Sequence, residues 1–133
     1  MSRKWRWVSE AVVLAIHDEQ LAEHGGRQGI RDIGLLRAAL ARPKHKAAYG
    51  KPDIARLAAA YAFGILRDHP FVDGNKRAAL VTFELFLLNN GYELAADEAG
   101  MLAIILGLAE GKITETAFAK WVRTHLKRRH LGR

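Results

Sequence analysis

The sequence predicts an all-α protein, a compact bundle of about six helices in one domain spanning residues 1–133. Apolar residues recur at helical spacing along most of the chain. Ser, Asp, Thr or Pro precedes these stretches and Gly follows several of them, which is typical of helix starts and ends. No stretch alternates apolar and polar residues for long enough to form a sheet, beyond one hairpin expected around 44–51. Half of the 133 residues are hydrophobic, which is enough for one core.

The first two helices are marked by their caps. Ser9 predicts the start of a helix over 10–24, which Gly25 ends. Residues from Gly25 to 33 are expected to form a loop. Asp32 is the predicted cap of the second helix. We expect that helix to end before Pro43, because the residue preceding a proline disfavours helical backbone.

Two further helices flank a polar loop. Pro52 fits the first turn of the third helix. Its apolar face would consist of Ile54, Leu57, Ala58, Tyr61 and Ile65. A loop opening at His69 separates it from the fourth helix, expected over 75–89 with Gly91 as its stop. The fourth helix has so little polar surface that we expect it to be the central, most buried one.

The C-terminal third contains a short extended piece and two more helices. Residues 92–94 are predicted to be extended, and Asp97 and Thr114 are the predicted caps of the two helices. The last helix would place four residues at core spacing, namely Phe118, Trp121, Val122 and His125.

The formal net charge of +7 comes from the two ends of the chain. Residues 1–7 and 127–133 hold seven of the 21 basic residues, which leaves 14 in the body against 14 acidic ones. We interpret these basic ends as solvated, flexible segments rather than a nucleic-acid footprint. Nucleic acid is therefore not directly expected as a partner.

Cysteine is absent, which excludes a disulfide framework and a thiolate metal site. The N-terminal residues do not resemble a signal peptide, because no apolar stretch follows the basic ones. The longest apolar stretches are interrupted too soon to span a bilayer. We therefore expect a cytoplasmic protein with no membrane partner.

Residues 69–77 read His-Pro-Phe-Val-Asp-Gly-Asn-Lys-Arg and carry the candidate chemistry. His69 opens the loop and is the usual kind of base near neutral pH. Phe71 is the apolar residue that would anchor the loop on the core. Asp73 is a hard oxygen ligand of the kind that holds Mg²⁺ beside phosphates. Gly74 would let the backbone approach a ligand closely.

The next three residues, Asn75, Lys76 and Arg77, fall in the first turn of the fourth helix. Free N–H groups and the helix dipole favour an anion there, and cationic side chains reinforce the site. A base, a metal ligand and positive charge around a phosphate are the parts that phosphoryl transfer needs. The P-loop sequence Gly-x-x-x-x-Gly-Lys-(Ser/Thr) is absent, so this would be a different phosphate site.

This stretch resembles the Fic/Doc family motif His-x-Phe-x-(Asp/Glu)-(Gly/Ala)-Asn-(Gly/Lys)-Arg, with seven defined positions in register. The Asn-Lys-Arg form resembles the death-on-curing branch. The likeness extends from roughly Val8 to Leu126. It includes His17-Asp18, Gly25-Gly26, Gly29, Asp32, Ala48-Tyr49 and Asn90-Gly91. The resemblance implies a Fic/Doc-type bundle, a toxin in a toxin–antitoxin pair, and the use of ATP with Mg²⁺.

The resemblance also implies roles for the motif residues. His69 would be the general base for a Ser or Thr hydroxyl of a target protein, and Asp73 would hold the metal. Asn75, with the backbone near Gly74, would stabilise the phosphate, and Arg77 would bind the nucleotide. Lys76 replaces the glycine of the nucleotidyl-transferring branch. It would act in catalysis and phosphate binding, directing the γ-phosphate of ATP rather than AMP to the target.

The resemblance further implies how the protein is controlled and what it modifies. The target would be a translation factor, whose modification arrests growth. Many Fic proteins carry an inhibitory helix of the form (Ser/Thr)-x-x-x-Glu-(Gly/Asn), but four residues before Glu110-Gly111 stands Leu106. We therefore expect restraint from a separate small antitoxin.

Several other interpretations remain open from the sequence. The chain could transfer AMP, or it could be a non-enzymatic DNA-binding or scaffold module that binds through its basic ends. A zinc site at His69 and Asp73 is a weaker idea, because no third ligand stands out. His17, mid-helix beside Asp18, is expected to be structural.

Overall fold

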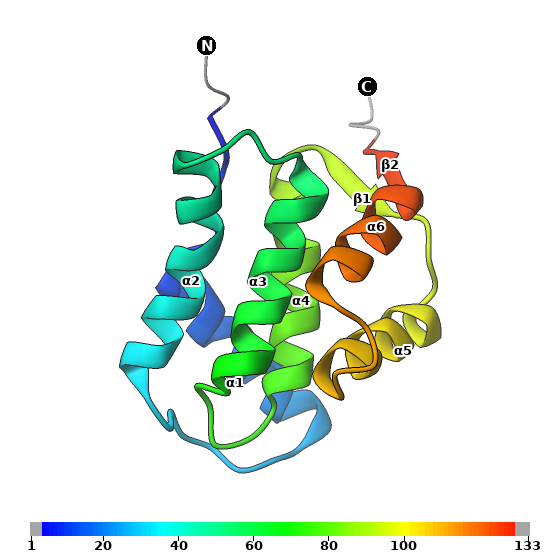
Figure 1. The fold of residues 1–133 in the computed structure, drawn as a ribbon. Helices are drawn as coiled ribbons and strands as arrows, with labels where there is room; N and C mark the ends of the chain where they lie inside the picture. Colours follow the sequence, from blue (N-terminus) through cyan, green and yellow to red (C-terminus); the bar gives the residue numbers. More distant parts are fainter. Residues whose placement is uncertain (1–3, 130–133) are drawn as a thin grey trace.

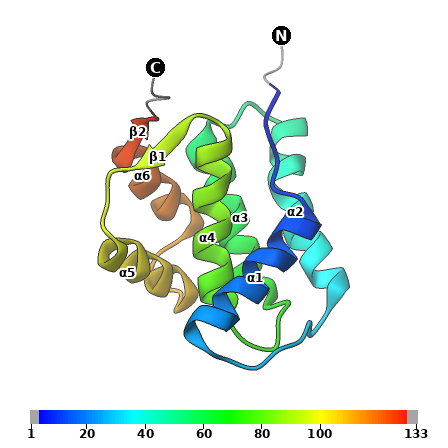
Figure 2. The same cartoon turned by 180° about the vertical axis from the view of Figure 1, so that it is seen from behind.

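Six helices and one small sheet form the described part of the chain, residues 4–129 of the computed structural model. The helices are α1 Glu10–His24, α2 Ile33–Ala48, α3 Ile54–Asp68, α4 Asn75–Asn89, α5 Glu98–Ala109 and α6 Glu115–His125. Helices α3 and α4 run side by side in the middle (Figure 1). Helix α2 lies on one side of them, α5 and α6 lie on the other, and α1 crosses α4 behind (Figure 2). The predicted all-α bundle is confirmed.

Capping side chains set most of these helix starts. In five helices the cap accepts a hydrogen bond from the amide three residues later. These caps are Ser9, Asp32, Asp53, Asp97 and Thr114. The exception is α4, whose cap is Gly74 and which has no side-chain cap. The predicted caps of α1, α2, α5 and α6 are thereby confirmed.

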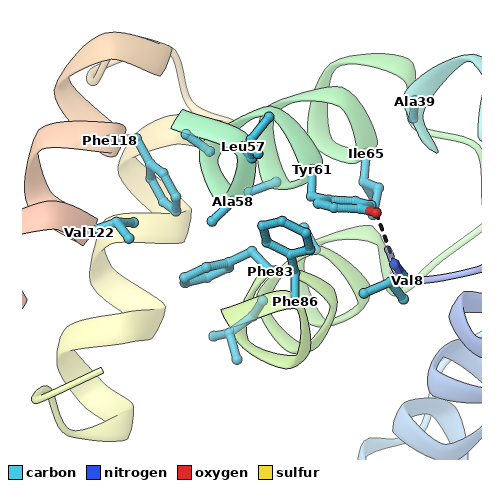
Figure 3. Close-up of a cluster of buried hydrophobic side chains, with 14 of the residues drawn as sticks. Val8, Ala39, Leu57, Ala58, Tyr61, Ile65, Phe83, Phe86, Phe118 and Val122 are labelled. Atoms are coloured by element: carbon cyan, nitrogen blue, oxygen red, sulfur yellow. Dashed lines mark hydrogen bonds between the residues drawn. The ribbon is translucent and has the colours of Figure 1, made fainter. Parts of the chain in front are cut away.

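The core lies between α3, α4 and α6 (Figure 3). Tyr61 packs on Phe86 with ring centroids 5.0 Å apart, and Phe83 meets Phe118 edge to face at 5.2 Å. All four rings are fully buried. Aromatic pairs in such geometries add to the stabilisation from their buried area.

Three expectations about the first half of the chain are wrong. Helix α2 continues through Pro43 to Ala48, so no hairpin forms around 44–51. Pro43 is buried, and α2 lies so close to α3 that a Cβ at Gly64 would come within 3.2 Å of Ala39. This close packing offsets the lost helical hydrogen bond. Pro52 precedes the cap of α3 rather than lying in its first turn.

Helix α4 is buried and central, as expected, but it is not the most buried helix. Helix α3 has ten buried residues and α4 has eight, so α3 is the more buried of the two. All five residues predicted for the apolar face of α3 are buried. Helix α4 keeps partly exposed apolar side chains where α5 and the N-terminal segment cover it only partly.

The sheet pairs two strands that lie far apart in the sequence. Strand β1, Tyr92–Leu94, is antiparallel to β2, Leu126–Arg128, with Tyr92 opposite Arg128 and Leu94 opposite Leu126. The extended piece at 92–94 is confirmed, whereas its partner strand was not expected. The sheet brings the end of the described chain back beside the end of α4 (Figure 1).

No helix within residues 4–129 is long and apolar enough to cross a membrane. Of the basic end segments, residues 1–3 and 130–133 lie outside the described residues. The described parts form hydrogen bonds through their main-chain amides, from Arg129 N–H to the Gly91 carbonyl and from Arg6 N–H to the Asn90 side-chain oxygen.

The hydrogen bond between Val8 and Tyr61 generates the first prediction. The Tyr61 hydroxyl accepts from the Val8 amide at 2.9 Å, and burial raises the pKa of Tyr61 to about 12 (Figure 3). Tyr61→Phe should lower the free energy of unfolding by about 1–3 kcal/mol, because the buried Val8 amide loses its acceptor. Urea denaturation measures this. Tyr49→Phe is the matched control, since Tyr49 is 89% exposed. Equal stabilities of the two variants would contradict the assignment.

Candidate active site

The loop between α3 and α4 begins with His69 in an unusual backbone conformation. His69 ends α3 with φ 52°, the one positive φ of a non-glycine residue among the described residues. Its amide donates to the Ile65 carbonyl at 3.0 Å. Left-handed backbone at a residue with a side chain costs about 1–3 kcal/mol and persists only where the surroundings enforce it. The imidazole itself is exposed.

Arg31 helps to hold His69 in this backbone conformation. Its Nε donates to the His69 carbonyl and its Nη2 to the Asp68 carbonyl, both at 2.7 Å. The amides of Arg31 and Asp32 also donate to the Pro70 carbonyl. These contacts neutralise the carbonyls at the C-terminus of α3, where a cation is favoured. The conformation of His69 therefore depends on a residue from the loop between α1 and α2.

That second loop, residues 25–32, lies along the motif loop (Figure 1). Ile30 and Phe71 form an isolated antiparallel bridge, and the Val72 amide donates to the Gly29 carbonyl at 3.0 Å. Gly26 and Gly29 have φ values of 130° and 125°, a region that side chains rarely adopt. The glycines of this segment therefore give loop geometry.

Phe71 is fully buried and anchors the motif loop. Its ring stacks on the imidazole of His17, with centroids 3.7 Å apart and planes 6° apart. His17 is also buried, and its Nε2 lies 2.8 Å from the Asp73 carbonyl oxygen. His17 therefore has the structural role expected for it, holding both the anchor and the backbone that precedes α4.

The side chain of Asn75 makes its contacts within the motif loop. Its amide oxygen accepts from the Phe71 amide, and its Nδ2 donates to the Phe71 carbonyl, both at 3.0 Å. The same Nδ2 lies 3.2 Å from His69 Nδ1. Asn75 is buried, and its side chain fixes the loop and contacts the histidine. Its contact with a phosphate stays a prediction.

The carboxylate of Asp73 is exposed and oriented by two amides. Oδ2 accepts from Arg27 N–H at 3.1 Å, and Oδ1 accepts from Gly74 N–H at 2.9 Å. The hydrogen bond from Arg27, followed by that from Gly74, lowers the pKa of the Asp73 carboxyl. An ionised, accessible carboxylate fits Mg²⁺, which keeps several waters and takes only one or two protein carboxylates beside substrate phosphates.

The N-terminus of α4 presents unpaired amides. The first amide of α4 with a helical acceptor is that of Ala78, which donates to the Gly74 carbonyl at 3.0 Å. The amides of residues 75–77 lie before it and have no acceptor within the helix. Gly74 adopts φ 78°, and a Cβ there would come within 3.4 Å of His17, so the tight turn requires glycine.

Two cationic side chains flank this helix end. Lys76 is exposed, and Arg77 is partly buried with Nη1 3.4 Å from Glu98 at the start of α5. An ion pair this exposed contributes little to stability, so Arg77 can exchange Glu98 for another anion. His69, Asp73, Gly74, Asn75, Lys76 and Arg77 together line a hollow of about 150 Å³. The structure thus brings every predicted polar site residue to one place.

No group of three or more His, Asp or Glu side chains that could hold a metal occurs within residues 4–129. Within these residues, the fold therefore supplies no third ligand for a zinc site at His69 and Asp73. Sequence reasoning also missed Arg31 and the Arg27 amide, because neither belongs to the motif. Both lie in the loop before α2, and no sequence pattern there predicts contact with the motif loop.

The fold and the site together define a class of protein. It is a bundle of six helices in which a loop beginning with a histidine leads into a helix without a side-chain cap. The Fic/DOC family profile matches residues 7–87. The chain is 32% identical over 119 residues to the protein kinase doc of Escherichia phage P1, covering 89% of this chain and 94% of that protein. It is 47% identical over 76 residues to toxin Doc of Mycolicibacterium smegmatis, covering 55% and 58%. The chain belongs to the Fic/Doc family.

Burial of Phe71 against His17 generates a second prediction. Phe71→Ala should lower the free energy of unfolding by about 3–5 kcal/mol, because a fully buried phenylalanine leaves a cavity. Thermal or urea denaturation measures the change. Val72→Ala is the matched control, since Val72 follows in the same loop and is 38% exposed. A Phe71→Ala protein as stable as the control would show that the loop is not anchored there.

Proposed function

We propose that this chain is a Doc-type toxin that transfers the γ-phosphate of ATP to a Ser or Thr hydroxyl of a target protein. The observation that carries the proposal is the uncapped N-terminus of α4 beside His69. Unpaired amides and a helix dipole favour a phosphate, and an exposed imidazole next to them can accept a proton. The names of the two relatives, protein kinase doc and toxin Doc, support the same reaction and role.

The reaction can be written from these groups. A target hydroxyl proton passes to an imidazole nitrogen of His69, and the hydroxyl oxygen forms a bond to the γ-phosphorus of ATP. The bond from that phosphorus to the β,γ-bridging oxygen breaks, so ADP leaves. The amides of residues 75–77 and the side chains of Lys76 and Arg77 stabilise the charge on the moving phosphoryl group.

Asn75 and Gly74 would help to bind the phosphate, and both also hold the loop in place. Asn75 contacts His69 Nδ1 and fixes the backbone on which the histidine lies, so it is a positioning residue. Gly74 lets the chain turn tightly into α4, which leaves the first amides accessible. Phe71 holds the loop on the core. These contributions follow the principle that prearranged groups need no reorganisation during the reaction.

Asp73 would hold Mg²⁺ together with phosphate oxygens. Bound there, Mg²⁺ would neutralise charge on the nucleotide. The low pKa of the Asp73 carboxyl keeps it ionised as a ligand, and its exposure leaves room for water and phosphate. Membership of the Fic/Doc family implies that a nucleotide is used.

Lys76 favours transfer of the γ-phosphate over transfer of AMP. It replaces the glycine expected of the nucleotidyl-transferring branch and projects from the α4 N-terminus into the lining of the hollow. A side chain with a charge at this position restricts how the nucleotide can lie and places a cation near its terminal phosphates.

Restraint would come from a separate small antitoxin protein. Glu110, the glutamate of the nearest match to an internal inhibitory segment, lies at the end of α5 and pairs with Lys112 instead of entering the hollow. An antitoxin segment that folds on binding is the simplest inhibitor of such an enzyme. The target would be a cytoplasmic translation factor, whose modification arrests growth.

Labelled ATP tests the proposal. The protein, incubated with bacterial lysate, should transfer label from γ-labelled ATP to a protein band and none from α-labelled ATP. His69→Ala should lower the rate by about 10² to 10⁴, the usual contribution of a positioned base. His45→Ala is the matched control, since His45 is exposed on α2. Transfer of the α-label, or full activity of His69→Ala, would contradict the proposal.

A further inference from the structure

The two basic ends of the chain meet at the end of the bundle opposite the motif loop. The start of the described chain and strand β2 both lie at the upper end of Figure 1, and the loop between α3 and α4 lies at the lower end. Figure 2 shows the same separation from behind. No sequence pattern predicts that the two ends meet, since they are more than 100 residues apart.

Specific hydrogen bonds hold the two ends together. The side chain of Asn90 accepts from the Arg6 amide and donates to the Arg6 carbonyl, both at 3.0 Å. On the other side of the same turn, the Arg129 amide donates to the Gly91 carbonyl at 2.9 Å. These contacts use main-chain atoms of Arg6 and Arg129, so both guanidinium groups remain available.

A cation-lined hollow of about 720 Å³ results. Lys4, Arg6 and Arg129 line it together with the turn at the end of α4. Within residues 4–129 these three side chains form no ion pair, whereas the neighbouring Lys127 pairs with Glu93. The last carbonyls of α4 accept from the Asn90 and Gly91 amides, which reduces their repulsion of an anion.

The distribution of basic residues along the chain concentrates positive charge at this end of the molecule. The body of the chain is formally neutral, so the excess of +7 comes from the two end segments. Such a concentration of one sign of charge attracts polyanions over a distance of about 10 Å at 0.1 M salt.

We propose that this hollow, which we call the basic hollow, binds the phosphodiester backbone of a nucleic acid. Among the described residues that line it, only Leu88 has an apolar side chain. An acidic amphipathic segment needs an apolar groove, which a single leucine does not form, whereas a phosphate backbone needs none. Arginine forks bind phosphate oxygens in pairs. This site goes beyond the proposed function, and its distance from the His69 loop lets both ends act at once.

Salt-dependent binding tests the proposal. Fluorescence anisotropy would compare a labelled 20-base-pair DNA duplex with a 20-nucleotide single-stranded RNA, to distinguish the two sources of phosphate. The test variant combines Lys4→Gln, Arg6→Gln and Arg129→Gln. The control combines Arg37→Gln, Lys112→Gln and Lys120→Gln, which are exposed elsewhere and remove the same net charge.

We expect the test variant to bind at least one of the two probes about tenfold more weakly than the control variant at low salt. The slope of log affinity against log salt should fall by about 2 to 3, one for each lost phosphate contact. Equal binding by the two triple variants would overturn the proposal. So would a poly-glutamate peptide that displaces the nucleic acid at lower charge concentration than unlabelled RNA, since an acidic protein would then be the better ligand.

A charge-neutral variant tests whether the meeting of the two ends matters. Asn90→Ala removes the contacts that hold Arg6 beside the turn and leaves every cation in place. Affinity for the nucleic acid should fall severalfold, at a temperature where circular dichroism shows the variant folded. Unchanged affinity would show that the cations act as loose tails and would overturn the basic hollow as a built site.

Discussion

The side-chain amide of Asn75 connects the parts of the active site to one another. It pairs with both the amide and the carbonyl of Phe71, and it contacts the imidazole of His69. Because Asn75 is also the first residue of α4, the same side chain links the anchor, the histidine and the helix start. A buried amide with its donors and acceptor used in this way specifies one loop conformation, since any other would leave polar groups unpaired.

The remaining contacts follow from that arrangement. With Phe71 fixed, His17 can stack on it and donate a hydrogen bond from Nε2 to the Asp73 carbonyl, which orients the turn through Gly74. With the turn fixed, no side chain is available to cap α4, and its amides face the hollow. The lack of a cap is costly for a helix standing alone. Here a bound phosphate would take the place of the cap, so the cost is recovered when substrate is present.

Local chemistry made much of this predictable from the sequence. Each cap residue acts within three residues of itself, so the starts of α1, α2, α5 and α6 could be read directly. The motif could be read because its residues are contiguous. The continuation of α2 through Pro43 could not be predicted in this way. The packing of Ala39 on Gly64, which offsets the hydrogen bond lost at the proline, is a tertiary contact. Three other features also depend on residues far apart in the sequence. They are the sheet, the hydrogen bond from Arg31 to the His69 carbonyl, and the contact between the two basic ends.

The central claim is that the unpaired amides at the start of α4 bind the phosphates of the nucleotide. Amide chemical shifts during a titration of the ¹⁵N-labelled protein with ATP and Mg²⁺ report this directly. The account predicts the largest changes at the amides of residues 75–77, with smaller changes at Asp73 and Gly74. Unchanged shifts at those amides, with changes confined to Arg6, Gly91 and Arg129 at the opposite end, would contradict it.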